Sequence, residues 1–198
     1  MPHDHGPHGH EHQDFDPERL LAQEERRRLI MPPEEVLAPL GEDLATLADV
    51  GCGAGFLALP LARLHPRARV LAVDRRRDSL DLVASRAAKA GLANIETVLA
   101  DATCLPFADE SVDAVLMASV FHDIPDRAAA RDEVRRVLRP GGTFLLIEWD
   151  RLDAGWGPPI ELRIGPEELA GVLAEGGFAV TELRQFGGPI YRLTARRA

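Results

Sequence analysis

The chain has 198 residues, a length that fits one domain with a sizeable core rather than two. A hydrophobic fraction of 45% and a charged fraction of 28% are typical of globular proteins, whereas a net charge of −9 makes nucleic acid an unsuitable main partner. The first residues are polar and no apolar run approaches the ~18 residues that span a bilayer, so we expect no membrane span and a cytoplasmic protein.

Residues 1–14 interleave five histidines with proline, glycine and acidic residues, and they hold nothing that could form a core. We expect a disordered His-rich tail. Its imidazoles could hold a divalent cation, but ligands without supporting contacts hold a cation loosely. Adventitious metal binding is therefore favoured over a dedicated site, and we assign no metal ligands.

A helix is expected to begin at Asp16-Pro17-Glu18, where an acidic cap precedes a proline suited to the first helical position. It should stop before Pro32-Pro33, and a second short helix should follow over residues 34–40. We expect residues 15–41 to form a helical lid over the open edge of a sheet, because something must exclude water from a ligand bound there.

From residue 44 onwards, short apolar runs alternate with helical segments, which predicts parallel strands buried on both faces. The expected strands cover residues 44–50, 69–74, 95–100, 112–118, 143–149, 178–186 and 190–197, with helices over 56–65, 79–90, 127–138 and 166–176. Only three residues join the last two strands, and so short a link requires antiparallel neighbours. Residues 42–198 are therefore expected to form one α/β domain.

The most informative segment is Asp49-Val50-Gly51-Cys52-Gly53-Ala54-Gly55-Phe56, between the first strand and the first helix of this domain. Its glycines let the backbone turn tightly and let a ligand approach without side chains in the way. The second strand ends at Asp74, whose carboxylate would lie beside this loop and could bind two vicinal ribose hydroxyls. An adenosyl compound or a dinucleotide is the natural ligand.

The spacing of the glycines distinguishes an adenosyl compound from a dinucleotide as the expected ligand. The dinucleotide fingerprint is GxGxxG, whereas the sixth position here is Phe56 and the glycines read GxGxG. Asp49 would face a diphosphate unfavourably, but it could orient the loop or receive an α-ammonium group. A nucleoside that carries an amino acid is therefore favoured over a nicotinamide dinucleotide.

Four segments in this order resemble the class I S-adenosylmethionine-dependent methyltransferases: DVGCGAGF (49–56), VDRRRDSL (73–80), LADATCLPFADESVDAVLMA (99–118) and VRRVLRPGGTFLLIEW (134–149). The resemblance covers about residues 33–198. It implies an α/β Rossmann-like fold with a seven-stranded, mostly parallel sheet, an antiparallel C-terminal strand and flanking helices. It also implies S-adenosyl-L-methionine as the cofactor, with the adenine amino group on Asp101 and Ala102 beside it.

These patterns together give a set of cofactor-binding candidates along the carboxyl edge of the sheet. The candidates are Asp49, Gly51, Cys52, Gly53, Gly55, Asp74, Arg75, Asp101, Ala102 and Ser119. The two acids that end or follow strands, Asp74 and Asp101, could instead be ordinary surface acids. The side chain of Cys52 is expected only to fill space.

Further stretches, FDPERL, MPPEEVL, VFHDI and RIGPEEL, resemble small bacterial methyltransferases near the ubiquinone/menaquinone and arsenite-methylating branches. Arsenite methylation in that branch depends on several cysteines, whereas this chain has only Cys52 and Cys104, which are in no CxxC pattern and indicate reduced thiols. The quinone branch differs in the residues after its fourth strand. Neither acceptor is therefore carried over to this chain.

Candidates for the acceptor side follow the fourth and fifth strands, at the edge where ligands bind in open α/β sheets. His122 is either a base in the pocket or a capping side chain, and with Asp123 it is our candidate for catalytic proton handling. We expect the acceptor pocket to lie between the lid and these strand ends, lined by His122, Trp149 and Arg163. Trp149 could instead pack in the core, and Arg163 could face an acceptor anion or a neighbouring acid.

Three functions remain open. A methyltransferase acting on a small-molecule acceptor is favoured over a noncatalytic cofactor- or metal-responsive protein on the same fold, and over a nicotinamide-dependent oxidoreductase. The pattern that names the donor does not name the acceptor, because methyl transfer needs a base only when the acceptor keeps its proton. A homodimer is also left open.

Overall fold

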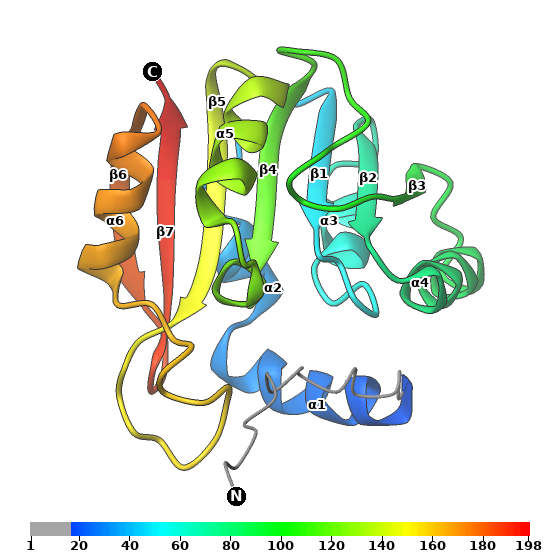
Figure 1. Cartoon of the computed structure of the whole chain (residues 1–198). Helices are drawn as coiled ribbons and strands as arrows, with labels where there is room; N and C mark the ends of the chain where they lie inside the picture. The colour runs from blue at the N-terminus through cyan, green and yellow to red at the C-terminus, as the bar shows by residue number, and fades with distance from the viewer. Residues whose placement is uncertain (1–16) are drawn as a thin grey trace, which may run out of the picture.

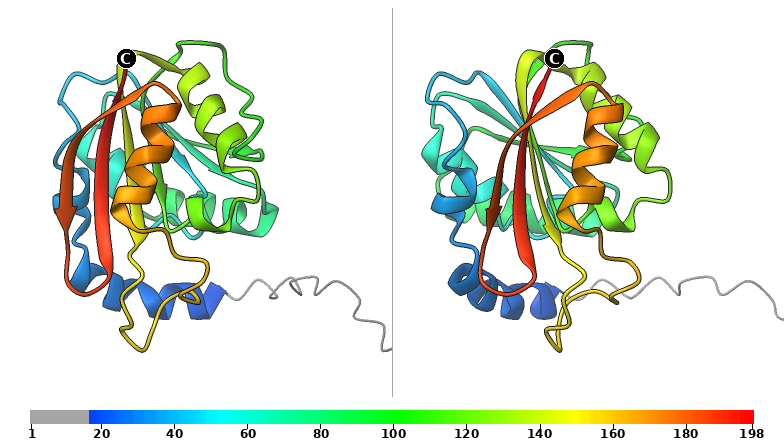
Figure 2. Two further views of the ribbon diagram at one scale, coloured as in Figure 1. Left: turned by 60° about the vertical axis from the view of Figure 1, so that its left-hand side comes forward. Right: turned by 90° about the vertical axis from the view of Figure 1, so that its left-hand side faces the viewer.

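The computed structural model describes residues 17–198, so the tail expected over residues 1–14 lies outside the described residues. These residues form one seven-stranded sheet with helices on both faces (Figure 1 and Figure 2). The helices are α1 (Pro17–Ile30), α2 (Pro33–Leu37), α3 (Ala58–Leu64), α4 (Arg77–Lys89), α5 (Arg127–Val137) and α6 (Pro166–Glu175), with a 3₁₀ turn η1 (Phe121–Asp123). The strands are β1 (Thr46–Val50), β2 (Arg69–Asp74), β3 (Ile95–Leu99), β4 (Val112–Ala118), β5 (Leu138–Trp149), β6 (Phe178–Gln185) and β7 (Ile190–Arg197).

The strands lie in the order β3-β2-β1-β4-β5-β7-β6. The first five are parallel neighbours, and β7 lies between β5 and β6 and runs antiparallel to both. The predicted fold class and the antiparallel pairing across the three-residue link are therefore confirmed.

The core lies on both faces of the sheet because side chains alternate along each strand. On β4, the fully buried Val115 and Met117 pack in a cluster with α5 and α6. The equally buried Ala114 and Leu116 pack on the other face with α2 and α3. The central strands are therefore apolar on both faces, as the continuous apolar runs predict.

Several bounds differ by one or two residues from the sequence prediction, and two features of the sheet differ more. β3 is only half-buried, because it is an edge strand with a neighbour on one side alone. β5 begins at Leu138 rather than at residue 143, so the expected turn is a bend inside a long strand. Gly141 has φ +74°, and a Cβ on Gly142 would lie 2.8 Å from the carbonyl oxygen of Arg139, so this bend requires glycine.

This topology gathers the carboxyl ends of β1, β2, β4 and β5 along one edge of the molecule. α1 lies across that edge, together with the loop between β5 and α6 (Figure 1). No helix within residues 17–198 has the length and apolar character needed to cross a membrane.

Candidate cofactor and acceptor site

The loop after β1 turns through three left-handed glycines, with φ +75° at Gly51, +52° at Gly53 and +85° at Gly55. The Gly51 N–H donates to the Val73 carbonyl at 2.8 Å, which ties the loop to β2. A Cβ on Gly51 would lie 2.4 Å from Val120 Cγ2, so the exit of β4 packs directly against this loop. A Cβ on Gly53 would meet nothing within 4 Å, so the outer side of the loop leaves room for a ligand.

Asp74 ends β2 with its carboxylate fixed beside that loop. Its Oδ2 accepts the Gly53 N–H at 2.9 Å, and its Oδ1 accepts the Arg76 N–H at 2.9 Å. Each carboxylate oxygen can accept a second hydrogen bond, and the side chain retains some exposure, at 9% for the residue. The residues present therefore fit a ligand that offers two adjacent hydroxyl donors.

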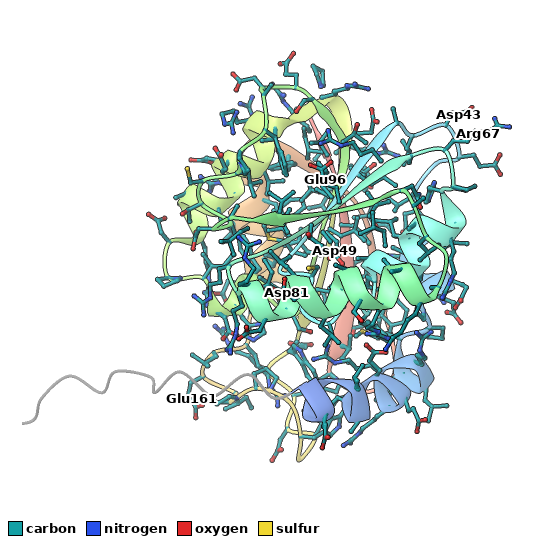
Figure 3. All side chains as sticks on the ribbon, turned by 90° about the vertical axis from the view of Figure 1, so that its right-hand side faces the viewer. Asp43, Asp49, Arg67, Asp81, Glu96 and Glu161 are labelled. Carbon is teal, nitrogen blue, oxygen red and sulfur yellow. The ribbon has the colours of Figure 1, made fainter. Side chains whose placement is uncertain are left out.

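Asp49 is buried beneath the loop, in the interior of the molecule behind α4 (Figure 3). Burial and, to a lesser extent, the negative charge of Asp74 raise the pKa of its carboxyl, and the hydrogen bond from the Ala58 N–H opposes both, so that the pKa is about 7. A cationic group placed at the loop would favour the ionised form. Asp49 can therefore accept a hydrogen bond at the start of α3 and also pair with an ammonium group.

The remaining cofactor candidates divide into one packing residue and one exposed cluster. Cys52 is buried in an apolar cluster, and burial and two neighbouring acids raise the pKa of its thiol. The exposed Asp101 accepts the Thr103 hydroxyl at 2.6 Å and its N–H at 2.9 Å. These bonds, and more weakly the charge of Arg75, lower the pKa of Asp101. Ala102 is half-buried beside it.

The exit of β4 places Ser119 between the glycine loop and the end of β5. Ser119 has φ +56°, an uncommon conformation for a residue with a side chain. Its Oγ accepts the indole N–H of Trp149 at 2.9 Å. The strained backbone is thereby fixed to the neighbouring strand, and the chain turns directly into η1.

His122, in η1, is buried and bonded to a residue that the sequence analysis missed. Its Nδ1 lies 2.7 Å from Oε2 of Glu148, a fully buried acid on β5. Glu148 Oε1 also accepts the N–H groups of Val120, Phe121 and His122, at 3.2, 2.8 and 3.3 Å. The available signal was a lone acid at the end of the apolar run FLLIEW, because a buried charge needs partners.

The predicted pocket residues do not line one cavity. Arg163 lines a hollow of about 340 Å³ with Trp156 and Ile160, within the loop between β5 and α6, but neither His122 nor Trp149 lines it. Trp149 instead packs edge-on against Trp156, with ring centroids 4.7 Å apart.

Arg163 bonds backbone carbonyls rather than a neighbouring acid among the described residues. The buried guanidinium donates to the carbonyls of Pro158, Trp156 and Leu152, at 2.9, 2.8 and 2.5 Å. Arg163 therefore stabilises the conformation of the loop between β5 and α6, because its N–H groups donate to backbone carbonyls of that loop.

Charged side chains of α1 contact the site edge. The Arg26 guanidinium lies over the Trp156 ring, 4.2 Å from its centroid. Glu24 pairs with Arg86 of α4 at 2.5 and 2.8 Å, and Arg86 also donates to the Ala54 carbonyl in the glycine loop at 2.5 Å. Helix α1, part of the expected lid, therefore contacts the loop after β5 through Trp156 and the glycine-loop side through Arg86.

A second hollow, of about 510 Å³, is lined by residues that include Arg67, Asn94 and Glu96. It lies at the amino ends of β2 and β3, and Figure 3 shows Arg67 and Glu96 far from Glu161 in the loop near α1. It belongs to the edge opposite the glycine loop. Within residues 17–198 no cluster of three or more metal-type side chains is present, and the His-rich tail is outside them.

A family model described as a methyltransferase domain matches residues 48–146, from β1 through most of β5. The chain belongs to this methyltransferase family. A solved structure of an S-adenosylmethionine-dependent methyltransferase from Aquifex aeolicus has 27% sequence identity and a TM-score of 0.84, with 93% of this chain and 100% of that chain covered. The cofactor of the family is S-adenosylmethionine, as the resemblance implied.

Curated relatives of the family match over shorter stretches. An uncharacterised protein of Mycobacterium tuberculosis is 40% identical over 125 residues, which cover 59% of this chain and 44% of the relative. A ubiquinone/menaquinone biosynthesis C-methyltransferase of Brucella canis is 37% identical over 119 residues, 59% of this chain and 44% of the relative. The chain thus spans less than half the length of these relatives.

Proposed function

We propose that this methyltransferase moves the methyl group of S-adenosylmethionine onto a small-molecule acceptor at the carboxyl edge of the sheet. The observation that carries the proposal is the Asp74 carboxylate, held beside an open glycine loop by the N–H groups of Gly53 and Arg76. That pair of acceptor oxygens matches the two ribose hydroxyls of an adenosyl cofactor. Asp49 beneath the loop suits its ammonium group, and the exposed Asp101 suits its adenine amino group.

The bound donor would supply a methyl group on a positively charged sulfur. The chain's own contribution is to position the two reactants and to exclude water, which is how proteins accelerate such an in-line displacement. α1 and the loop that Arg163 shapes cover the edge where the acceptor has to enter. We propose His122 and Asp123, whose Nε2 and Oδ1 atoms lie 3.5 Å apart, as the residues that take a proton from the acceptor.

Titration calorimetry with S-adenosylhomocysteine tests the cofactor part of this proposal. Asp74→Asn removes the charge and one acceptor, and charge-assisted bonds contribute about 1.5–3 kcal/mol each, so the Kd should rise at least about tenfold. Asp81→Asn, an exposed acid on α4, should leave the Kd unchanged. Equal Kd values for both variants would remove Asp74 from the site, and binding of NAD instead would favour an oxidoreductase.

A labelled methyl donor, offered with a panel of alcohols, phenols, amines and thiols, tests catalysis itself. Label transfer to one compound class is expected. Cofactor binding without transfer to any compound would favour a noncatalytic protein. The homodimer, the cytoplasmic location and the loose metal binding of the tail stay predictions.

A further inference from the structure

The hydrogen bond between His122 and Glu148 determines which ring nitrogen is basic. A carboxylate has no hydrogen to donate, so Nδ1–H is the donor in the 2.7 Å contact with Oε2. The other ring nitrogen, Nε2, then keeps its lone pair in the neutral ring. Three backbone N–H groups hold the second carboxylate oxygen, so the acid cannot rotate away from the ring.

The charges around the ring favour its protonated form. Burial by itself lowers the pKa of His122, but the hydrogen bond and charge of Glu148, with the charge of Asp123, outweigh burial and the opposing charge of Arg127, so the pKa is raised. Asp123 Oδ1 lies 3.5 Å from Nε2, and the Asp123 side chain is 61% exposed. The protonated ring would therefore have a carboxylate at each nitrogen, the buried Glu148 at Nδ1 and the exposed Asp123 at Nε2.

The position of η1 brings this pair beside the glycine loop. Val120, the residue before η1, packs against Gly51, and its N–H is one of the three held by Glu148. The Glu148 carboxylate therefore holds both Val120, which contacts the glycine loop, and the His122 ring.

We propose that Glu148 is a positioning residue that fixes His122 as the proton acceptor, and that the methyl acceptor is a hydroxyl or amine compound that still carries its proton at neutral pH. This inference rests on the proposed function. The acceptor proton passes to His122 Nε2 while the oxygen or nitrogen lone pair forms a bond to the methyl carbon. The carbon–sulfur bond breaks, and its electron pair stays on sulfur as S-adenosylhomocysteine forms. A thiolate acceptor would need no such base.

Nitrogen-15 NMR of the His122 ring tests the positioning role without any acceptor. In the wild-type protein above the ring's pKa, we expect the proton on Nδ1 and the lone pair on Nε2. Glu148→Gln keeps an oxygen for the backbone N–H groups, and it should lower the pKa of His122 and mix the two tautomers. Glu182→Gln, which removes the ion-pair partner of the buried Arg192 on β7, is the matched control and should change neither.

A wild-type ring with its proton on Nε2, or a Glu148→Gln spectrum that titrates like the wild type, would overturn the positioning role. Glu148→Asp keeps the charge but withdraws it by one methylene group. The pKa of His122 in this variant should lie between those of the wild type and Glu148→Gln. If Glu148→Gln does not fold, Glu148→Asp replaces it in the test.

Methyl transfer to the panel compounds tests the base and the acceptor class. With a hydroxyl or amine acceptor, His122→Gln should lower the rate about 100-fold or more, because positioned bases contribute about 10²–10⁴-fold. The rise of the rate with pH should move to lower pH in Glu148→Gln and stay in place in Glu182→Gln. Turnover of thiols alone, or an unchanged rate in His122→Gln, would overturn the acceptor class. No transfer to any compound, with the expected NMR result, would overturn the proposed function and leave the positioning role standing.

Discussion

The buried carboxyl of Asp49 links cofactor chemistry to stability at the scale of a single residue. Its pKa of about 7 in the folded protein compares with 3.8 for an ordinary aspartate. Between these two values the native state binds a proton that the unfolded chain does not bind. Stability should therefore fall as the pH rises from about 4 to about 7, by up to about 1.4 kcal/mol per pH unit.

Asp49→Asn should flatten this dependence, because the amide does not titrate. The measurement is the free energy of unfolding by urea at several pH values, with Asp81→Asn as a control that keeps the wild-type slope. A variant that retains the full slope between pH 4 and pH 7 would show that another group is responsible.

Residue roles carried by local spacing could be predicted from the sequence, whereas roles carried by distant partners could not. The glycines and Asp74 are recognisable because a tight turn and a strand-end carboxylate leave a fixed pattern along the chain. Glu148 and His122 lie 26 positions apart, and only the pairing of β4 with β5 brings them together. The backbone partners of Arg163 could not be predicted either, because no side-chain pattern reveals hydrogen bonds to carbonyl groups.

Among the elements, α1 depends on a few polar contacts at its site-facing edge. Glu24 is 7% exposed and pairs through both oxygens with Arg86, which also bonds the glycine loop. Such a charge-assisted, largely buried pair contributes about 1–3 kcal/mol. Opening of α1 should therefore require breaking this pair.

Glu24→Gln should increase amide hydrogen exchange in α1 about tenfold or more, because each 1.4 kcal/mol changes an opening equilibrium tenfold. Exchange followed by mass spectrometry is the measurement. Glu25→Gln, one position further along on the exposed side, should exchange like the wild type. Similar exchange in the two variants would mean that other contacts hold α1 in place.

The elements predicted best are those whose pattern is set by burial, such as β2 and β4, which match their expected bounds. β5 was placed too short, because Pro140-Gly141-Gly142 indicates a turn in the chain. In the structure Leu138 already pairs with Val112 of β4, and the glycines form the bend that follows. Pairing with β4 therefore sets the start of β5, which the local turn preference of Pro140-Gly141-Gly142 does not predict.

Across the whole molecule, Arg192 joins segments that are far apart in sequence. Its buried guanidinium, 1% exposed as a residue, donates to the Glu35 carbonyl at 2.6 Å and to Glu182 Oε2 at 2.6 Å. Arg192→Met should lower the free energy of unfolding by about 1–3 kcal/mol, because the carbonyls of Glu35 and Val36 lose their side-chain donor. Urea unfolding is the measurement, and the exposed Arg196→Met should cost less than about 1 kcal/mol. An equal loss in the two variants would contradict this role.

The place of β7 in the sheet has a consequence for the order of assembly during synthesis. β7 is made after β6, yet it lies between β5 and β6 and pairs with both. A nascent chain that ends at β6 therefore has an incomplete sheet with an open gap, and its newest strand has no partner. Exposed strand edges of this kind attract other chains, so we expect such nascent chains to need shielding on the ribosome until β7 emerges and fills the gap.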